Sequence, residues 1–214
     1  MKTVLVTGGT TRLGKAISEH LRAQGWQVLT TSHRADSGAD ILADFTKPDG
    51  AARAYAEARR LLGGQAPDAL VNNAALFAGD AAMLNAVNLD APQALTRLMA
   101  VRTTGRGAVV NILDTRVLSE KSTDFGAYSA TKTGLMAATR ADAVRFAATL
   151  RVNGLAPGPV LAPTAVREKA GEMLVDRPTP TDVAHGVAYL LAANATTGAI
   201  LPVDGGQSLV LRLP

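Results

Sequence analysis

Short runs of β-branched and aliphatic residues alternate along this chain with longer stretches rich in Ala, Leu and Arg. The runs that predict strands are Lys2–Thr7, Gln27–Ser32, Asp40–Leu42, Ala69–Asn72, Ala108–Leu113, Arg151–Leu155 and Ile200–Val203. The stretches that predict helices are Arg12–Gln24, Pro48–Leu62, Leu84–Arg102, Gly126–Ala148 and Pro180–Ala193. Continuously apolar strands that are each followed by a helix indicate a parallel sheet covered on both faces. The sequence therefore predicts an α/β fold with a doubly wound parallel sheet, whose ligands bind beyond the carboxyl ends of the strands.

The length and composition favour one soluble enzyme domain. The chain has 214 residues with no internal repeat or linker, so we expect a single domain over residues 1–214. No apolar run reaches the roughly 18 residues that a membrane span needs, and the N-terminal apolar run is too short for a signal peptide. We therefore expect a cytoplasmic protein without a membrane partner.

The residue composition argues against several classes of function. Cysteine is absent, which excludes thiolate chemistry, and the three histidines (His20, His33 and His185) show no metal-ligand spacing, so we expect no metal site. The net charge of +4 comes from dispersed basic residues, and only 4% of residues are aromatic. We therefore expect no nucleic-acid partner, and the positive balance suits an anionic small molecule.

A glycine-rich turn joins the first predicted strand to the first predicted helix, at residues 7–14 (TGGTTRLG). Glycines let the backbone turn sharply and approach a pyrophosphate, while the helix N-terminus offers free N–H groups to the phosphates. Glycines also favour a simple strand-to-helix turn, but the position at the first βα junction favours a Rossmann-like dinucleotide site. The candidate cofactor-binding residues here are Gly8, Thr11, Arg12, Leu13 and Gly14.

The end of the second predicted strand indicates which dinucleotide binds. NAD sites carry an acid at this point, whereas NADP sites place a cation near the extra phosphate. This chain reads Ser32-His33-Arg34, so His33 and Arg34 are candidate phosphate contacts and NADP(H) is the expected cofactor. Arg34 could also be a solvated loop residue. Asp44, after the third strand, could accept a hydrogen bond from the adenine amino group, or could only cap a turn.

Tyr128 and Lys132 lie four residues apart in a predicted helix and so share one face. A phenol with a pKa of about 10 is a poor proton donor or base at neutral pH. We expect the Lys132 ammonium to lower the pKa of Tyr128 toward the working range, and the same amine could reach a ribose hydroxyl. The pair alone is also common among ordinary surface residues.

The order of these elements resembles the short-chain dehydrogenase/reductase family over the whole chain. The matching segments are residues 7–14, Asn72-Asn73-Ala74, Asn88, Tyr128 with Lys132, Arg151-Val152-Asn153, Pro157-Gly158 and Val203-Asp204-Gly205-Gly206. The resemblance implies hydride-transfer chemistry with Tyr128 and Lys132 as catalytic residues. It also implies that Asn73 and Ala74 lie near the cofactor, that Asn88 holds a proton-relay water, and that Pro157 and Gly158 flank the nicotinamide.

Two departures from the common family pattern point to a subgroup. Arg12 stands where a central glycine is usual, and Asp114 stands where a catalytic serine is usual. Pteridine reductases and dihydromonapterin reductases carry similar replacements, and Phe77 falls where they place an aromatic ring against the pterin. The resemblance implies that Arg12, Phe77, Asp114 and Tyr128 contact substrate. The alternative roles, which involve no substrate, are a phosphate contact for Arg12, a turn cap for Asp114 and a core position for Phe77.

Spacing leaves some of these assignments open. Asn73 and Asn88 are only 15 residues apart, which leaves little more than one helical turn between them, so Asn88 could lack its relay role. Asp114 precedes Tyr128 by 14 positions, one more than in the family, which makes Thr115 a rival for the supporting role. The segment Pro159–Val175, which closes over substrate in relatives, is short.

These features favour an NADPH-dependent reductase of a dihydropterin-type heterocycle, with a small-molecule substrate and Tyr128 as proton donor. A general carbonyl or 3-oxoacyl reductase is the alternative within enzymes, and an NADP-binding protein without turnover is the alternative outside them. The intact Tyr128 and Lys132 pair argues against a mere binder. Because relatives pack their long helices against copies of themselves, we also expect a homodimer or homotetramer.

Overall fold

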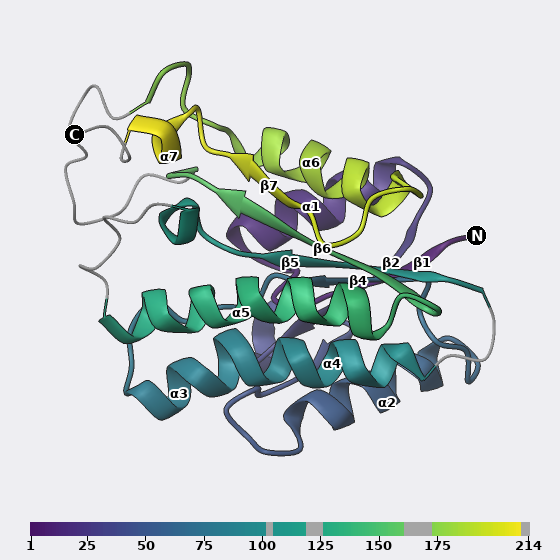
Figure 1. The fold of residues 1–214 in the computed structure, drawn as a ribbon. Helices are drawn as coiled ribbons and strands as arrows, with labels where there is room; N and C mark the ends of the chain where they lie inside the picture. Colours follow the sequence, from purple (N-terminus) through teal and green to yellow (C-terminus); the bar gives the residue numbers. More distant parts are fainter. Residues whose placement is uncertain (102–104, 119–125, 161–172, 211–214) are drawn as a thin grey trace.

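The fold is a seven-stranded parallel sheet between two layers of helices (Figure 1). We describe it from a computed structural model over residues 1–101, 105–118, 126–160 and 173–210. The strands are β1 (Thr3–Val6), β2 (Gln27–Ser32), β3 (Ile41–Leu42), β4 (Ala69–Asn72), β5 (Gly107–Ile112), β6 (Leu150–Pro157) and β7 (Ile200–Val203). Their order is β3-β2-β1-β4-β5-β6-β7, and each neighbouring pair is parallel. The strand order reverses beside β1, so the loops after β1 and β4 meet at the switch point where such sheets bind ligands.

Helices cover both faces of the sheet, as the alternation predicted. In Figure 1, α1 (Arg12–Ala23) and α6 (Pro180–Ala192) lie on one face, and α2 (Gly50–Leu61), α4 (Ala91–Ala100) and α5 (Gly126–Arg145) lie on the other. Alternate residues of one strand serve the two layers, since successive side chains point to opposite faces. Val4 and Val6 pack in the cluster under α1 and α6, whereas Leu5 packs in the cluster under α2 and α4. No helix in the described ranges is long and apolar enough to cross a membrane.

The third predicted helix, Leu84–Arg102, begins earlier than expected and is not uniform. It starts as α3 (Ala81–Asn85), continues as one π-helical turn, η2 (Ala86–Asp90), and ends as α4. Asp80 sets the start, because its side chain accepts a hydrogen bond from the Met83 backbone N–H at 2.8 Å. The expected end at Arg102 lies outside the described residues. The short elements η1 (Ala35–Ser37), η3 (Thr115–Leu118) and α7 (Gln207–Val210) were not predicted.

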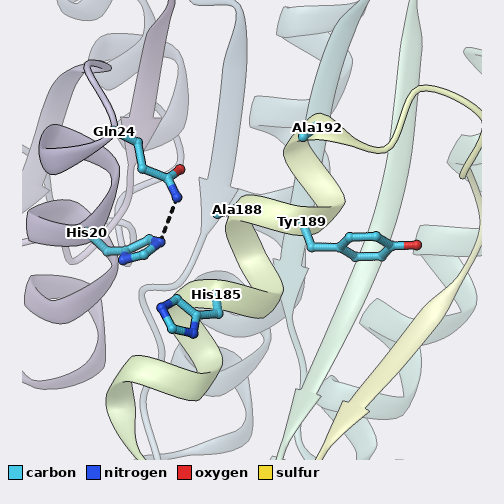
Figure 2. A pocket seen from close by; sticks show the side chains of 6 residues that line it. All are labelled: His20, Gln24, His185, Ala188, Tyr189 and Ala192. Atoms are coloured by element: carbon cyan, nitrogen blue, oxygen red, sulfur yellow. Dashed lines mark hydrogen bonds between the residues drawn. The ribbon is translucent and has the colours of Figure 1, made fainter.

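The packing of α1 against α6 brings together two histidines that are far apart in the sequence (Figure 2). The rings of His20 and His185 meet edge to face, with centroids 4.7 Å apart, and the Gln24 amide lies 3.0 Å from His20 Nε2. Together with Tyr189 they line a shallow hollow of about 350 Å³. Their only evident role is helix–helix packing.

This ring contact predicts a loss of stability in mild acid. Burial lowers the pKa of His20, and the charge of His185 lowers it further. The folded chain therefore binds this proton more weakly than the unfolded chain, and the free energy of unfolding falls as the pH drops through the unfolded pKa of about 6.5. Chemical denaturation above and below that pH should show a smaller acid-induced loss for His20→Gln than for wild type. The exposed His33, changed to Gln, is the control. An equal loss in wild type and His20→Gln would contradict the prediction.

Candidate active site

The glycine turn between β1 and α1 is packed too closely for side chains. Gly8 has a left-handed backbone (φ 62°), and its N–H donates to Thr31 Oγ1 at 3.2 Å. A Cβ on Gly14 would lie 2.0 Å from the Gly8 carbonyl oxygen, and one on Gly9 would lie 2.7 Å from a Thr30 methyl group. The turn therefore presents bare backbone at the start of α1, which is the cradle that a pyrophosphate needs.

Thr7 and Asn73 brace this turn against the end of β4. Thr7 Oγ1 accepts hydrogen bonds from the backbone N–H groups of Asn73 (2.9 Å) and Ala74 (3.0 Å). The Asn73 side-chain amide donates to the carbonyl oxygens of Thr7 (2.9 Å) and Gly8 (3.2 Å). The structure thus places Asn73 and Ala74 beside the glycine turn and shows that the Asn73 amide N–H groups hold the turn; their contact with the cofactor stays a prediction.

Arg12 adopts a backbone conformation that suits the glycine it replaces. Its φ is +49°, the sole left-handed value at a non-glycine residue in the described part of the chain. Such a conformation costs on the order of 1–3 kcal/mol. Arg12 and its neighbour Thr11 are exposed, and Leu13 packs partly into the core cluster under α1 and α6. The arginine therefore stands free at the mouth of the turn.

Arg34 is not the free cation that the sequence suggested. Its guanidinium donates two hydrogen bonds to Asp36, Nε to Oδ1 at 3.1 Å and one terminal nitrogen to Oδ2 at 2.8 Å. Its backbone N–H donates to Ser32 Oγ at 3.1 Å. His33 is exposed beside it. The Arg34 and Asp36 side chains are both largely exposed, so a phosphate can compete with Asp36 for the Arg34 guanidinium.

Asp44 forms the turn that the sequence offered as its alternative role. Its Oδ1 accepts from Thr46 Oγ1 at 2.6 Å and from the Thr46 backbone N–H at 2.9 Å. The Thr46 side-chain and backbone hydrogen bonds lower the pKa of Asp44. The carboxylate is exposed, and a contact with adenine stays a prediction.

Asp114 and Tyr128 meet at the carboxyl edge of the sheet. Asp114 follows β5, Tyr128 lies in the first turn of α5, and the phenol O–H donates to Asp114 Oδ2 at 3.1 Å. Thr115, the rival for this contact, is buried and donates instead to Asp204 Oδ2 at 2.5 Å. The structure therefore brings Asp114, and not Thr115, to the tyrosine.

Lys132 is buried below Tyr128, one helical turn along α5. Its Nζ donates to the Ile112 carbonyl oxygen at 2.9 Å and lies 6.0 Å from the centre of the Tyr128 ring. Burial lowers the pKa of Lys132 to about 8, and the negative charge of Asp114 opposes this shift. An amine with a pKa near neutrality can hold or release a proton at working pH.

The prediction that Lys132 lowers the pKa of Tyr128 is wrong for the protein alone. Burial raises the pKa of the Tyr128 phenol well above its ordinary value, and the charge and hydrogen bond of Asp114 raise it further. The positive charge of Arg116 opposes this shift. Tyr128 is therefore a neutral phenol in the protein alone, and it holds its proton more tightly than an ordinary tyrosine does.

Phe77 is a second aromatic group at this site. Its ring stacks on the Tyr128 ring, with centroids 5.0 Å apart and an angle of 24° between the planes. The side chain is 67% exposed, so the alternative of a core position is wrong. Phe77 therefore packs against the Tyr128 ring, which is 7% exposed, and leaves most of its own ring exposed.

Asn88 lies in the π-helical turn and is fully buried. Its side chain accepts from the Leu76 backbone N–H and donates to the Leu76 carbonyl oxygen, both at 2.8 Å, and it donates to Thr131 Oγ1 at 3.2 Å. These bonds fix the chain next to Phe77 and tie it to α5. π-Helical turns often occur at functional sites, and the relay role of Asn88 stays a prediction.

Pro157 and Gly158 close the site at the end of β6. The Gly158 N–H donates to the Val203 carbonyl oxygen at 2.9 Å, and a Cβ on Gly158 would lie 2.8 Å from the Asp204 Cα. The segment Pro159–Val175 was expected to close over substrate, and its residues 161–172 lie outside the described residues. Arg151 and Asn153, also on β6, bond to carbonyl oxygens of residues 190–196 and so anchor the end of α6.

Known proteins match this chain over nearly its full length. The family model for short chain dehydrogenases matches residues 2–174. The chain belongs to the short-chain dehydrogenase family. Glucose 1-dehydrogenase 2 of Bacillus subtilis is 30% identical to it and is similar over 97% of this chain and 95% of that protein.

Solved short-chain dehydrogenases share its architecture. Alternative dihydrofolate reductase 1 (FolM) of Brucella canis, in complex with NADP, is 30% identical, with a TM-score of 0.80 over 97% of this chain and 94% of that one. Aldohexose dehydrogenase of Thermoplasma acidophilum is 26% identical, with a TM-score of 0.85 over 100% and 95% of the two chains. As a short-chain dehydrogenase, the protein is an NAD(P)-dependent oxidoreductase.

Proposed function

We propose that this short-chain dehydrogenase uses NADPH to reduce a dihydropterin-type heterocycle, with Tyr128 as the proton donor. The observation that carries the proposal is the contact of Tyr128 with two side chains at once. Asp114 accepts its hydroxyl hydrogen bond, and Phe77 stacks on its ring. The similarity to the NADP-bound dihydrofolate reductase of Brucella canis supports both the cofactor and the substrate class.

The glycine turn fits the pyrophosphate of NADPH. Gly8 and Gly14 let the turn pack closely against the end of β4, where protein atoms already crowd the position of any added Cβ. The turn leads directly into α1, whose first N–H groups would bind the phosphates. Arg34 and His33 would hold the 2′-phosphate, and Lys132 would reach the nicotinamide ribose. When bound, NADPH supplies the hydride.

The proton step depends on the neutral state of Tyr128. The raised pKa keeps Tyr128 protonated but makes it a weaker acid, so it would donate only to a substrate nitrogen that has gained negative charge. The tyrosinate so formed gains from the buried Lys132 amine, which can take up a proton at its lowered pKa of about 8. Asp114 would orient the phenol and, with Arg12, offer polar contacts to a substrate amino group.

The substrate class follows from the shape and polarity of the site. A flat heteroaromatic ring can slide over the exposed ring of Phe77 and present a nitrogen to the phenol. An aliphatic ketone could use Tyr128 alone and would gain little from Asp114 or Phe77. These two side chains therefore favour a pterin over a general carbonyl or 3-oxoacyl substrate.

One assay tests the proposed function. NADPH oxidation is measured with dihydropterins, dihydrofolate and a panel of ketones, 3-oxoacyl thioesters and aldoses. Turnover of dihydropterins or dihydrofolate, lost in Phe77→Ala and in Asp114→Asn, is the expected result. Turnover of ketones or sugars with no reaction or binding of pterins would overturn the substrate class.

Arg34 is expected to decide the preference for NADPH. Arg34→Glu should weaken NADPH binding at least about 10-fold while changing NADH binding little, since a charged hydrogen bond to phosphate contributes about 1.5–3 kcal/mol. Asp36→Asn is the matched comparison, because it frees the same guanidinium, and it should tighten NADPH binding. Titration of Trp26 fluorescence measures both cofactors, and equal effects on NADPH and NADH would discredit the phosphate contact.

Two exposed apolar side chains support assembly through the helices on one face of the sheet. Val144 on α5 is 81% exposed and Val101, at the end of α4, is 84% exposed. A second copy of the chain would cover them. We therefore infer a homodimer or homotetramer, and light scattering of wild type and Val144→Glu measures it.

A further inference from the structure

Asp114 and Thr115, the two residues that the sequence offered as partners of Tyr128, form hydrogen bonds with different groups. Asp114 and Thr115 are adjacent at the start of η3, yet Asp114 faces the tyrosine and Thr115 faces Asp204. Sequence spacing allowed either residue to support the phenol. The structure therefore raises the question of what fixes the choice.

Asp204 lies at the end of β7 and is 5% exposed. Its Oδ2 accepts from Thr115 Oγ1 at 2.5 Å and from the Ser208 backbone N–H at 2.9 Å, and its Oδ1 accepts from the Gly206 backbone N–H at 2.9 Å. Burial opposes its ionisation, but these hydrogen bonds outweigh burial and lower the pKa of Asp204. The carboxylate is thus a fixed charged acceptor for the Thr115 hydroxyl.

Arg116, which lies in η3, contacts the Asp114 carboxylate and holds it near Tyr128. The Arg116 backbone N–H donates to Asp114 Oδ1 at 2.9 Å, and the Arg116 guanidinium lies 3.5 Å from Oδ2. Rotation of η3 that released Thr115 toward Tyr128 would withdraw Asp114 and break the bond to Asp204. A hydrogen bond to a charged acceptor contributes about 1.5–3 kcal/mol, which is enough to favour one of the two arrangements strongly.

We propose that Asp204 is a positioning residue that holds the Thr115 hydroxyl away from Tyr128 and thereby makes Asp114 the partner of the phenol. This inference deepens the proposed function and rests on it, because the Asp114–Tyr128 contact is the feature that suits a heterocyclic substrate. The loop that follows Asp204 also contacts the chain before α6. The Gly205 carbonyl oxygen accepts from the backbone N–H groups of Leu174 (2.8 Å) and Val175 (3.1 Å). The turn at Asp204 and Gly205 therefore joins η3 to the chain at Leu174 and Val175.

Three variants test the proposal. Thr115→Val keeps the shape and removes the hydroxyl, Asp204→Asn removes the charge, and Thr115→Ser restores the hydroxyl. We expect kcat with the best substrate to fall about 10- to 100-fold in the first two, as a displacement of about 1 Å does in other enzymes, with NADPH affinity within about twofold of wild type. Thr115→Ser should recover most of kcat.

A second readout does not depend on turnover. The chain has three tyrosines, Tyr55, Tyr128 and Tyr189, so ring-labelled tyrosine gives few NMR signals, and Tyr128→Phe identifies one of them. When Asp114 withdraws, the Tyr128 phenol loses the acceptor of its hydrogen bond, so its ring signal should shift in Thr115→Val and Asp204→Asn relative to wild type. If Asp204→Asn does not fold, Thr115→Val alone decides.

The outcomes separate the two proposals. If the wild-type protein turns over no pterin but the Tyr128 ring signal shifts in both variants, the proposed function is refuted and the positioning role is supported. Turnover in wild type with an unchanged Tyr128 signal in Thr115→Val would overturn the positioning role. Equal losses of kcat and NADPH affinity, without recovery in Thr115→Ser, would overturn it too, since they would indicate general damage to the fold.

Discussion

Tyr128→Phe is expected to remove nearly all turnover while leaving NADPH affinity close to that of wild type. The phenol is the group that donates the proton, and a positioned general acid contributes about 10²- to 10⁴-fold to the rate. Phenylalanine keeps the ring that stacks on Phe77, so this contact survives. Steady-state assays give kcat, and quenching of the Trp26 fluorescence gives the dissociation constant of NADPH.

Tyr189→Phe is the matched control for this change. Tyr189 lies on α6, is 59% exposed, and lines the hollow beside His20 and His185. Removal of the Tyr189 hydroxyl should leave kcat unaltered. Wild-type kcat in Tyr128→Phe would show that another group donates the proton, and a large loss of NADPH affinity would show that Tyr128 acts mainly in binding.

Gly14→Ala is expected to abolish tight NADPH binding and to destabilise the protein. The new methyl group would lie 2.0 Å from the Gly8 carbonyl oxygen and 2.5 Å from the Asn73 amide nitrogen. Both belong to the braced turn, so the turn itself must open. Overpacking costs about 1–3 kcal/mol and often more against backbone. We expect NADPH affinity to fall at least about 100-fold, since the phosphate cradle is the part displaced.

Gly134→Ala makes the same chemical change at a site that can absorb it. A Cβ on Gly134 would meet only the Leu89 side chain, at 3.1 Å, within α5. Thermal denaturation and NADPH titration of the two variants measure the difference. If Gly14→Ala bound NADPH as tightly as Gly134→Ala does, the cofactor site would have to be placed away from the glycine turn.

The layout of the sheet was predictable because its strands are continuous apolar runs. The bounds of β2, β4 and β7 agree with those predicted from the sequence, and the parallel sheet with helices on both faces is confirmed. The contact between Asp114 and Tyr128 was expected from the resemblance to pteridine reductases and not from the pattern, and Thr115 was left open as a rival. Local pattern and chain order are sufficient only for the sheet.

Contacts that depend on distant parts of the chain were not predicted. Thr115 and Asp204 are 89 residues apart, and no periodicity links them.

Two local features of the site were also missed. The pairing of Arg34 with Asp36 could have been predicted, because the acid stands only two residues after the arginine. The pKa of Tyr128 was predicted in the wrong direction, because burial and the Asp114 charge outweigh a lysine whose own charge is disfavoured by burial.

The left-handed backbone of Arg12 places stability and activity in opposition at one residue. A glycine there would relax the main chain and make the empty enzyme harder to unfold, but it would delete the guanidinium at the mouth of the crevice. Thermal stability and affinity for a polar ligand should therefore move in opposite directions when Arg12 is changed to glycine.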